Sequence, residues 1–81
     1  MNKTIGVLEA KGYSAVLSAA EKILENKNIQ LLKIEKTGGG IVSSFFEGDF
    51  ENITSAFDDG IKHARLVGEI VSVYILSKSR I

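Results

Sequence analysis

Three consecutive glycines, Gly38, Gly39 and Gly40, follow Lys36 and Thr37 between two strand-like runs. A tight connection between two strands normally needs one or two residues that tolerate a positive φ, so three glycines exceed that need. A backbone without side chains can approach a ligand, an ion or another chain closely. Residues 36–40 are therefore either a place of close approach or a flexible hairpin tip.

Residues that could do acid–base or nucleophilic chemistry are few. The single histidine, His63, follows Asp59 by four residues in a helical pattern, which favours a solvated ion pair over a catalytic dyad. Asp58 and Asp59 are adjacent, so on a helix they point about 100° apart and are poorly placed to chelate one ion. The chain contains no cysteine, which excludes disulfides and thiolate metal sites. We predict no catalytic residue, no metal site and no cofactor.

Length and charge narrow the class of protein further. The chain has 81 residues, with ten basic and ten acidic side chains, so it lacks the electrostatic signature of binding to nucleic acid or to an anionic membrane. No signal peptide or bilayer-spanning run is readable, and we expect a soluble cytoplasmic protein. A chain this short without disulfides often depends on partner subunits for stability, so we also expect an oligomer.

Hydrophobic periodicity predicts two helices and four strands in the order β-α-β-β-α-β. The expected strands are residues 4–10, 29–36, 41–47 and 70–76, and the expected helices are residues 13–25 and 50–65. This order is the split βαβ, or ferredoxin-like, plan. It predicts one α+β domain over residues 1–81, in which a mainly antiparallel four-stranded sheet carries both helices on one face. Residues 77–81 are expected to form a flexible tail.

Local signals add detail to this plan. Residues 26–28 should end the first helix, because asparagine tolerates the left-handed conformation at a helix terminus. Asp49 is a candidate N-cap of the second helix. Gly60 lies inside that helix at a cost of about 1 kcal/mol, which indicates a close packing contact. In the strand over 29–36, Leu32 and Ile34 are expected on one face. The second helix should bury Phe50, Ile53, Ala56, Phe57, Ile61 and Ala64.

Apolar residues fall on both faces of the predicted sheet. Phe45 and Phe46 are adjacent in one strand and must point to opposite sides, and Leu8, Leu31 and Val71 add to the apolar surface. The strand lacks the alternation of basic and aromatic residues that is typical of RNA-recognition strands. Burial of the second face requires another chain, unless these are scattered exposed residues of the usual kind.

Taken together, these residues resemble the bacterial microcompartment shell family, in particular its single-domain, hexamer-forming proteins. The resemblance covers nearly the whole chain. It is carried by an ordered set of segments at similar spacing, namely residues 5–12, 19–21, 28–31, 35–40, 48–49, 58–60 and 67–70.

The resemblance implies a non-enzymatic shell tile. Six copies would form a flat disc, and discs would tile into a sheet that encloses enzymes. The pore on the six-fold axis would be lined by Lys36, Thr37, Gly38, Gly39 and Gly40. The family often has a small polar residue at the narrowest point, where this chain has Gly39. A wider aperture lined by backbone amides, with lysines nearby, would favour small anionic metabolites.

The resemblance also implies contacts at the edge of the hexamer, through Glu25, Asn28 and Lys78. The family usually has a lysine where this chain has Glu25, often an arginine in place of Lys78, and frequently an arginine in place of Glu47. A carboxylate offers no hydrogen-bond donor to a neighbouring disc and repels its symmetry mate. We therefore expect weaker tiling with copies of itself than is usual in the family, and other shell proteins as lateral neighbours.

Two other classes share the β-α-β-β-α-β order. An ACT-like regulatory module would be a dimer that binds a small molecule through a glycine-containing loop. An acylphosphatase would need an arginine in a phosphate-cradling loop, and the only arginines here are Arg65 and Arg80.

Overall fold

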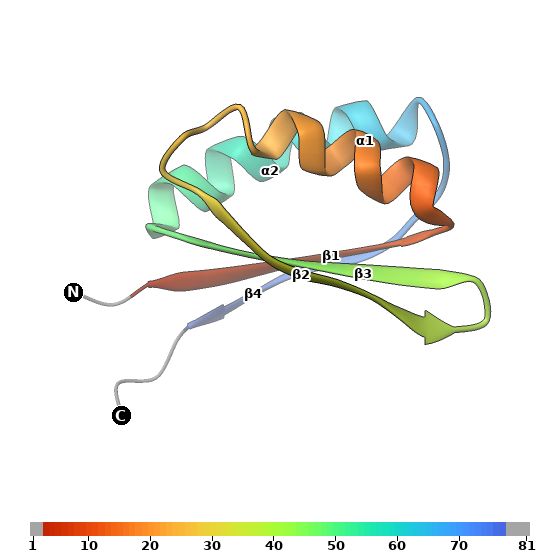
Figure 1. The fold of residues 1–81 in the computed structure, drawn as a ribbon. Helices are drawn as coiled ribbons and strands as arrows, with labels where there is room; N and C mark the ends of the chain where they lie inside the picture. The colour runs from red at the N-terminus through yellow and green to blue at the C-terminus, as the bar shows by residue number, and fades with distance from the viewer. Residues whose placement is uncertain (1–2, 78–81) are drawn as a thin grey trace.

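The computed structural model describes residues 3–77. Its elements are β1 (Thr4–Lys11), α1 (Tyr13–Ile23), β2 (Gln30–Gly38), β3 (Ile41–Gly48), α2 (Phe50–Arg65) and β4 (Ile70–Ser77). The strands form one sheet in the order β2-β3-β1-β4, and every neighbouring pair is antiparallel. Both helices cover the same face of this sheet (Figure 1), so the α+β prediction is confirmed. The expected tail was to begin at residue 77, but Ser77 is the last residue of β4, and residues 78–81 lie outside the described residues.

The core lies between the helices and one face of the sheet. Leu8 of β1, Phe46 of β3 and Ile53 of α2 are fully buried there. The rings of Phe46 and Phe57 meet edge to face at 5.5 Å between centroids, an arrangement that aromatic pairs prefer. Gly6 in β1 leaves room for this contact, because a Cβ at Gly6 would lie 2.7 Å from the Phe57 ring.

The two helices approach closely at Gly60. A Cβ at this position would lie 2.7 Å from Cγ1 of Ile23 and 3.3 Å from the carbonyl oxygen of Ala19, both in α1. Real Cβ atoms almost never come within 3 Å of another heavy atom, so a side chain here would force the helices apart. The predicted close contact at Gly60 is confirmed.

Two expected features at the helix ends needed correction, although the bounds of α2 agree with the prediction. Helix α1 ends at Ile23, two residues earlier than expected. No non-glycine residue among the described ones has a positive φ, so asparagine does not end the helix in the left-handed conformation. Instead, Asn26 Oδ1 accepts a hydrogen bond from the Asn28 amide at 2.9 Å, and Asn26 Nδ2 donates to Asn52 Oδ1 at 3.1 Å. Asp49 occupies the N-cap position of α2, but its side chain makes no capping bond.

Two predictions about which residues are buried were also wrong. A register shift in β2 between Leu31 and Lys33 leaves Leu32 exposed, so Leu31 and Ile34 are the residues that pack against the core. A β-bulge of this kind adds a residue to one strand and reverses the face of the residues beyond it. Phe50, at the first position of α2, is 59% exposed and does not join the core.

The close contact between the helices leads to a stability prediction. Gly60→Val should lower the free energy of unfolding by about 1–3 kcal/mol more than Asp59→Val, because only the first change places atoms against Ile23. Both positions lie within α2 and Asp59 is exposed, so the matched variant carries the helix propensity of valine without the packing clash. Urea unfolding at one protein concentration measures the difference. If both variants lose the same free energy of unfolding, the helices can move apart at position 60 without an energetic cost.

Candidate functional site

Three connections gather at one end of the molecule: the β2–β3 hairpin, the β1–α1 junction and the α2–β4 loop (Figure 1). Backbone hydrogen bonds join them. The Gly12 amide donates to the Gly40 carbonyl at 2.8 Å, and the Lys11 amide donates to the Glu69 carbonyl at 3.0 Å. The hairpin is therefore tied at its base to the body of the domain.

All three hairpin glycines have a positive φ, with values of 109° at Gly38, 63° at Gly39 and 80° at Gly40. Positive φ at both residues of a two-residue turn suits the right-handed twist of the flanking strands, and glycine adopts it without steric cost. A Cβ at any of the three would meet no atom of this chain within 4 Å. Backbone conformation thus accounts for the whole glycine run, and the run alone does not indicate close approach to a partner.

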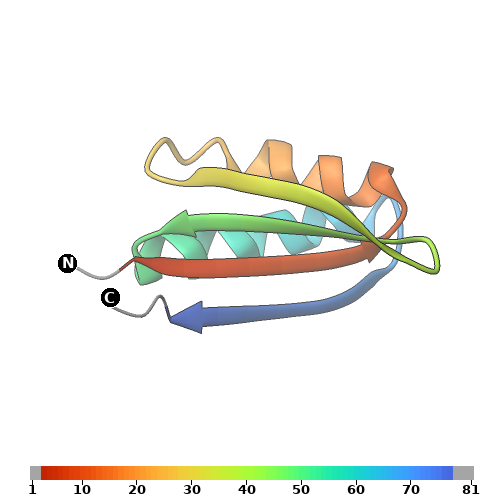
Figure 2. The same ribbon diagram turned by 60° about the horizontal axis from the view of Figure 1, so that its bottom comes forward.

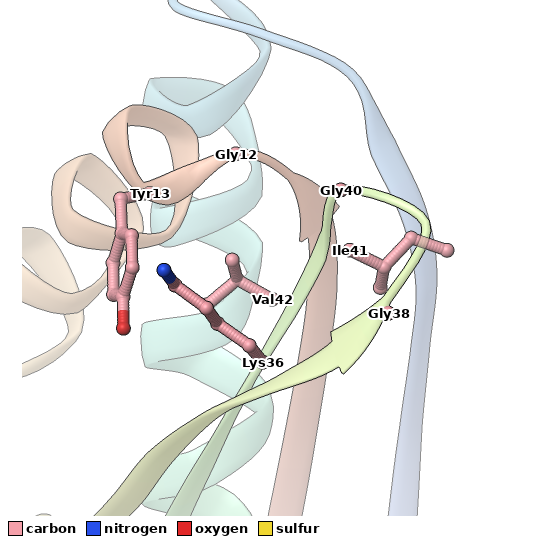
Figure 3. Close-up of a pocket in the computed structure, with 7 residues that line it drawn as sticks. All are labelled: Gly12, Tyr13, Lys36, Gly38, Gly40, Ile41 and Val42. Atoms are coloured by element: carbon pink, nitrogen blue, oxygen red, sulfur yellow. The ribbon is translucent and has the colours of Figure 1, made fainter.

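Lys36 points away from the hairpin tip and toward α1. Its ammonium lies 5.4 Å from the centroid of the Tyr13 ring, within the range of a cation–π interaction. Figure 3 shows the lysine between the Tyr13 ring and Val42. These side chains, Ile41 and the glycines of the two connections line a pocket of about 250 Å³.

The sheet face away from the helices is mostly apolar near its middle. Residues opposite one another in the sheet share a face, and the pairs Val7–Phe45 and Val7–Tyr74 place three of them side by side on β3, β1 and β4. Ile5 pairs with Leu76 in the next row on that side. We call Ile5, Val7, Phe45, Tyr74 and Leu76 the outer apolar face. Figure 2 shows the four strands side by side with the helices behind them.

A carboxylate lies next to the middle of this surface. Glu9 on β1 accepts hydrogen bonds from Ser43 of β3 and Ser72 of β4, each at 2.6 Å and each to a different carboxylate oxygen. Hydrogen bonds from Ser43 and then Ser72 hold the pKa of the Glu9 carboxyl below its ordinary value, against a smaller opposing effect of burial. Glu9 therefore links three strands and stays anionic at neutral pH.

The predicted edge residues Glu25 and Asn28 lie in the α1–β2 connection, at the end of the molecule opposite the glycine hairpin (Figure 1). The Glu25 carboxylate forms an ion pair with the Lys22 ammonium at 3.1 Å and remains mostly exposed. Glu47 lies in β3 opposite Gln30. Lys78, the third predicted edge residue, lies outside the described residues.

The remaining polar residues form no reactive cluster. Asp59 and His63 make no ion pair with each other; Asp58 instead pairs with the Lys62 ammonium at 3.4 Å on the solvent side of α2. Within residues 3–77, no group of three or more acidic or histidine side chains is placed to hold a metal ion. In the same range no helix is long and apolar enough to cross a membrane.

Comparison with known proteins identifies the family to which this geometry belongs. The BMC domain model matches residues 4–79. The chain belongs to the BMC domain family of bacterial microcompartment shell proteins. This confirms the resemblance and favours a shell protein over an ACT-like module.

Curated relatives share most of the chain. The microcompartment shell protein PduA of Citrobacter freundii is 33% identical over 76 residues, which cover 94% of this chain and 82% of PduA. EutM of Escherichia coli K12, also a shell protein, is 26% identical over 94% of this chain and 78% of its own length. The carboxysome assembly protein CcmO of Synechococcus elongatus is 30% identical over 91% of this chain but only 27% of CcmO.

A solved structure agrees on the fold. The crystal structure of a microcompartments protein from Desulfitobacterium hafniense DCB superposes with a TM-score of 0.81 over 94% of this chain, at 21% identity. The chain spans 41% of that larger protein.

The structure adds four residues that the sequence reasoning missed: Tyr13, Glu9, Ser43 and Ser72. A single acidic residue in the middle of the apolar strand β1 was the available signal for the Glu9 cluster. Strand pairing was needed to find its partners, since Ser43 and Ser72 are 34 and 63 residues away along the chain.

The Glu9 cluster predicts a pH-dependent stability. A carboxyl with a lowered folded-state pKa contributes stability that is present above its unfolded pKa of about 4.3 and is lost as pH falls through the folded value. Replacing both Ser43 and Ser72 by alanine should raise the Glu9 pKa and lower stability at pH 7 by on the order of 1 kcal/mol.

This difference from the wild type should shrink as the pH falls through the lowered folded-state pKa of wild-type Glu9, because Glu9 is then protonated in both proteins. Carbon-13 NMR of the glutamate carboxyl groups measures the pKa, and urea unfolding at pH 7 and pH 3 measures stability. Ser18→Ala is the control, because Ser18 donates to the His63 carbonyl and touches no carboxylate. A Glu9 pKa that is unchanged in the double variant would contradict the assignment.

Proposed function

We propose that this protein is a non-enzymatic structural tile of a microcompartment shell, in which six copies surround a central pore. The observation that carries the proposal is the BMC domain match over residues 4–79, which spans every described helix and strand. The partners of such a tile are other copies of the chain, other shell proteins and the enzymes that the shell encloses.

The geometry of one subunit supports a disc. The domain is elongated, with extents of 35 × 24 × 15 Å, and the glycine hairpin and Glu25 lie at opposite ends of it. Six elongated subunits arranged radially would bring the hairpins to the axis and carry the edge residues to the rim. A residue at the axis cannot also contact a neighbouring disc at the rim. The distance between the hairpin and Glu25 within one subunit is therefore what a hexamer with a pore at its centre and contacts at its edge requires.

Exposed apolar surface supports a multimer. Strand β4 is at the edge of the sheet, and Tyr74 and Leu76 on its outer side remain 41% and 47% exposed. On its helix side, Val73 and Ile75 are also 36% and 39% exposed, and its outer edge pairs with no other described strand. A second copy that covers the outer apolar face would remove this area from water, at about 25 cal/mol per Å² of apolar surface.

In the proposed hexamer, the pore is lined by Thr37, Gly38, Gly39 and Gly40, with Lys36 behind them. Thr37 Oγ1 donates to the Ile41 carbonyl at 3.4 Å, which turns the hydroxyl back toward the hairpin. The glycines offer backbone amides without side chains. Amides at the mouth and six lysine ammoniums near it would favour small anions over cations.

Native mass spectrometry tests the assembly. We expect a particle of six times the 8.8 kDa chain mass at micromolar concentration. Tyr74→Glu should release folded subunits, because a carboxylate buried in an apolar interface without a partner is strongly unfavourable. Ser55→Glu adds the same charge to the exposed side of α2 and should leave the hexamer intact.

Circular dichroism checks that both variants remain folded. A wild-type monomer or dimer that does not assemble further with other shell proteins would exclude the tile.

We also propose that Glu25 limits side-by-side assembly of these hexamers. In this arrangement Lys22, in the last turn of α1, is already engaged in an ion pair with Glu25. Two Glu25 carboxylates that meet across a two-fold axis would repel each other, and neither could donate a hydrogen bond to the neighbouring edge.

Glu25→Lys should therefore increase the extent of two-dimensional sheets seen by negative-stain electron microscopy at neutral pH. Glu25→Gln separates the two causes: it removes the repulsion and supplies an amide donor, but it adds no positive charge. We expect its sheets to be intermediate in extent. Extended wild-type sheets that do not change in either variant would show that Glu25 has no part in tiling.

A further inference from the structure

The pocket beside the hairpin has the chemistry of a small binding site. It measures about 250 Å³, below the range of about 300–1,000 Å³ that is typical for drug-sized ligands, so it suits a smaller molecule. Its walls come from three parts of the chain: the start of α1, the end of β2 and the start of β3. The Gly12–Gly40 hydrogen bond closes it at one side.

The pocket carries one positive charge and no negative charge. Lys36 is the single charged side chain among its lining residues, and α1 has no acidic residue in its first turn. Within residues 3–77 the Lys36 ammonium forms no ion pair, whereas Lys11 and Lys33 are paired with Glu69 and Glu35. The Tyr13 ring holds the ammonium at the pocket without neutralising it.

The rest of the lining is apolar. Val42 is buried on the side of β3 that Lys36 and the Tyr13 ring occupy, whereas the half-buried Ile41 directs its side chain away from the ring (Figure 3). A molecule that fits must therefore place an anionic group on Lys36 and a short hydrocarbon part against the Tyr13 ring. A doubly charged, fully hydrated anion such as phosphate satisfies the first condition but not the second.

We propose that this pocket binds a short-chain monocarboxylate of about three or four carbons, with its carboxylate on the Lys36 ammonium and its hydrocarbon end against the Tyr13 ring. The site belongs to a single subunit. It differs from the proposed axial pore and would retain a carboxylate beside that pore.

Saturation-transfer-difference NMR with propionate tests the site on the assembled protein. We expect saturable binding in the millimolar range, with the strongest transfer to the methyl protons. Lys36→Gln should weaken binding by about tenfold or more, because it removes a charge-assisted hydrogen bond. Lys36→Arg keeps the positive charge and should retain most of the propionate binding. Retained binding in this variant would show that substitution at position 36 does not abolish the signal by misfolding the protein.

Lys33→Gln is the matched control. Lys33 also lies over an aromatic ring, 4.7 Å from the Phe45 centroid, but it does not line the pocket. This variant should bind propionate as the wild type does. Propionamide, which has the same shape without the charge, should bind at least about tenfold more weakly than propionate.

Two results would overturn the proposal: equal propionate binding by the wild type and Lys36→Gln, or inorganic phosphate that competes as strongly as butyrate. A pocket filled by a neighbouring copy would give no propionate signal in any variant and would also overturn it. Native mass spectrometry of the same samples reports the oligomer separately, so failure of the carboxylate site and failure of the hexamer are distinguishable.

Discussion

The sheet is covered on one face only, and this constraint governs the rest of the structure. Two helices bury Leu8, Phe46 and Ile53 against one side, and no described element covers the other. An antiparallel sheet can leave one face in water when that face is polar. Here the outer face carries Ile5, Val7, Phe45, Tyr74 and Leu76. Val7 is fully buried, but Tyr74 and Leu76 are exposed, so the folded chain still exposes apolar surface that favours association.

The core occupies one layer between the two helices and the sheet, and close contacts between these elements keep that layer tightly packed. Gly60 lets α2 approach α1 at Ile23, and Gly6 lets β1 approach the Phe57 ring. Both glycines act through the volume they leave free, unlike those of the hairpin, which act through their positive φ. A chain of 81 residues has little core to spare, so each such contact carries a large share of its stability.

The sequence was sufficient for the order of elements, the antiparallel sheet and the close contact at Gly60, because these follow from hydrophobic periodicity and from glycine inside a helix. It could not locate the bulge that exposes Leu32, since an extra residue in one strand leaves no local mark. The Glu9 cluster was equally hidden, because its serines come from two other strands. Asp49 and Asn26 were given standard roles at helix ends that the structure does not show.

The position of the glycine hairpin in the fold is more informative about assembly than its three glycines are. From the sequence, the three glycines indicated either close approach to a partner or a flexible hairpin tip, and their φ values of 109°, 63° and 80° explain them within one chain. What the conformation does not explain is where the hairpin lies: at one end of an elongated domain, opposite Glu25, with Lys36 turned back toward Tyr13. A turn that needed glycine only for its backbone could occur at any corner of the fold. Its place at the end opposite Glu25 is therefore the structural feature that supports the proposed axis, and substitutions that keep the positive φ can separate the shape of the turn from its part in assembly.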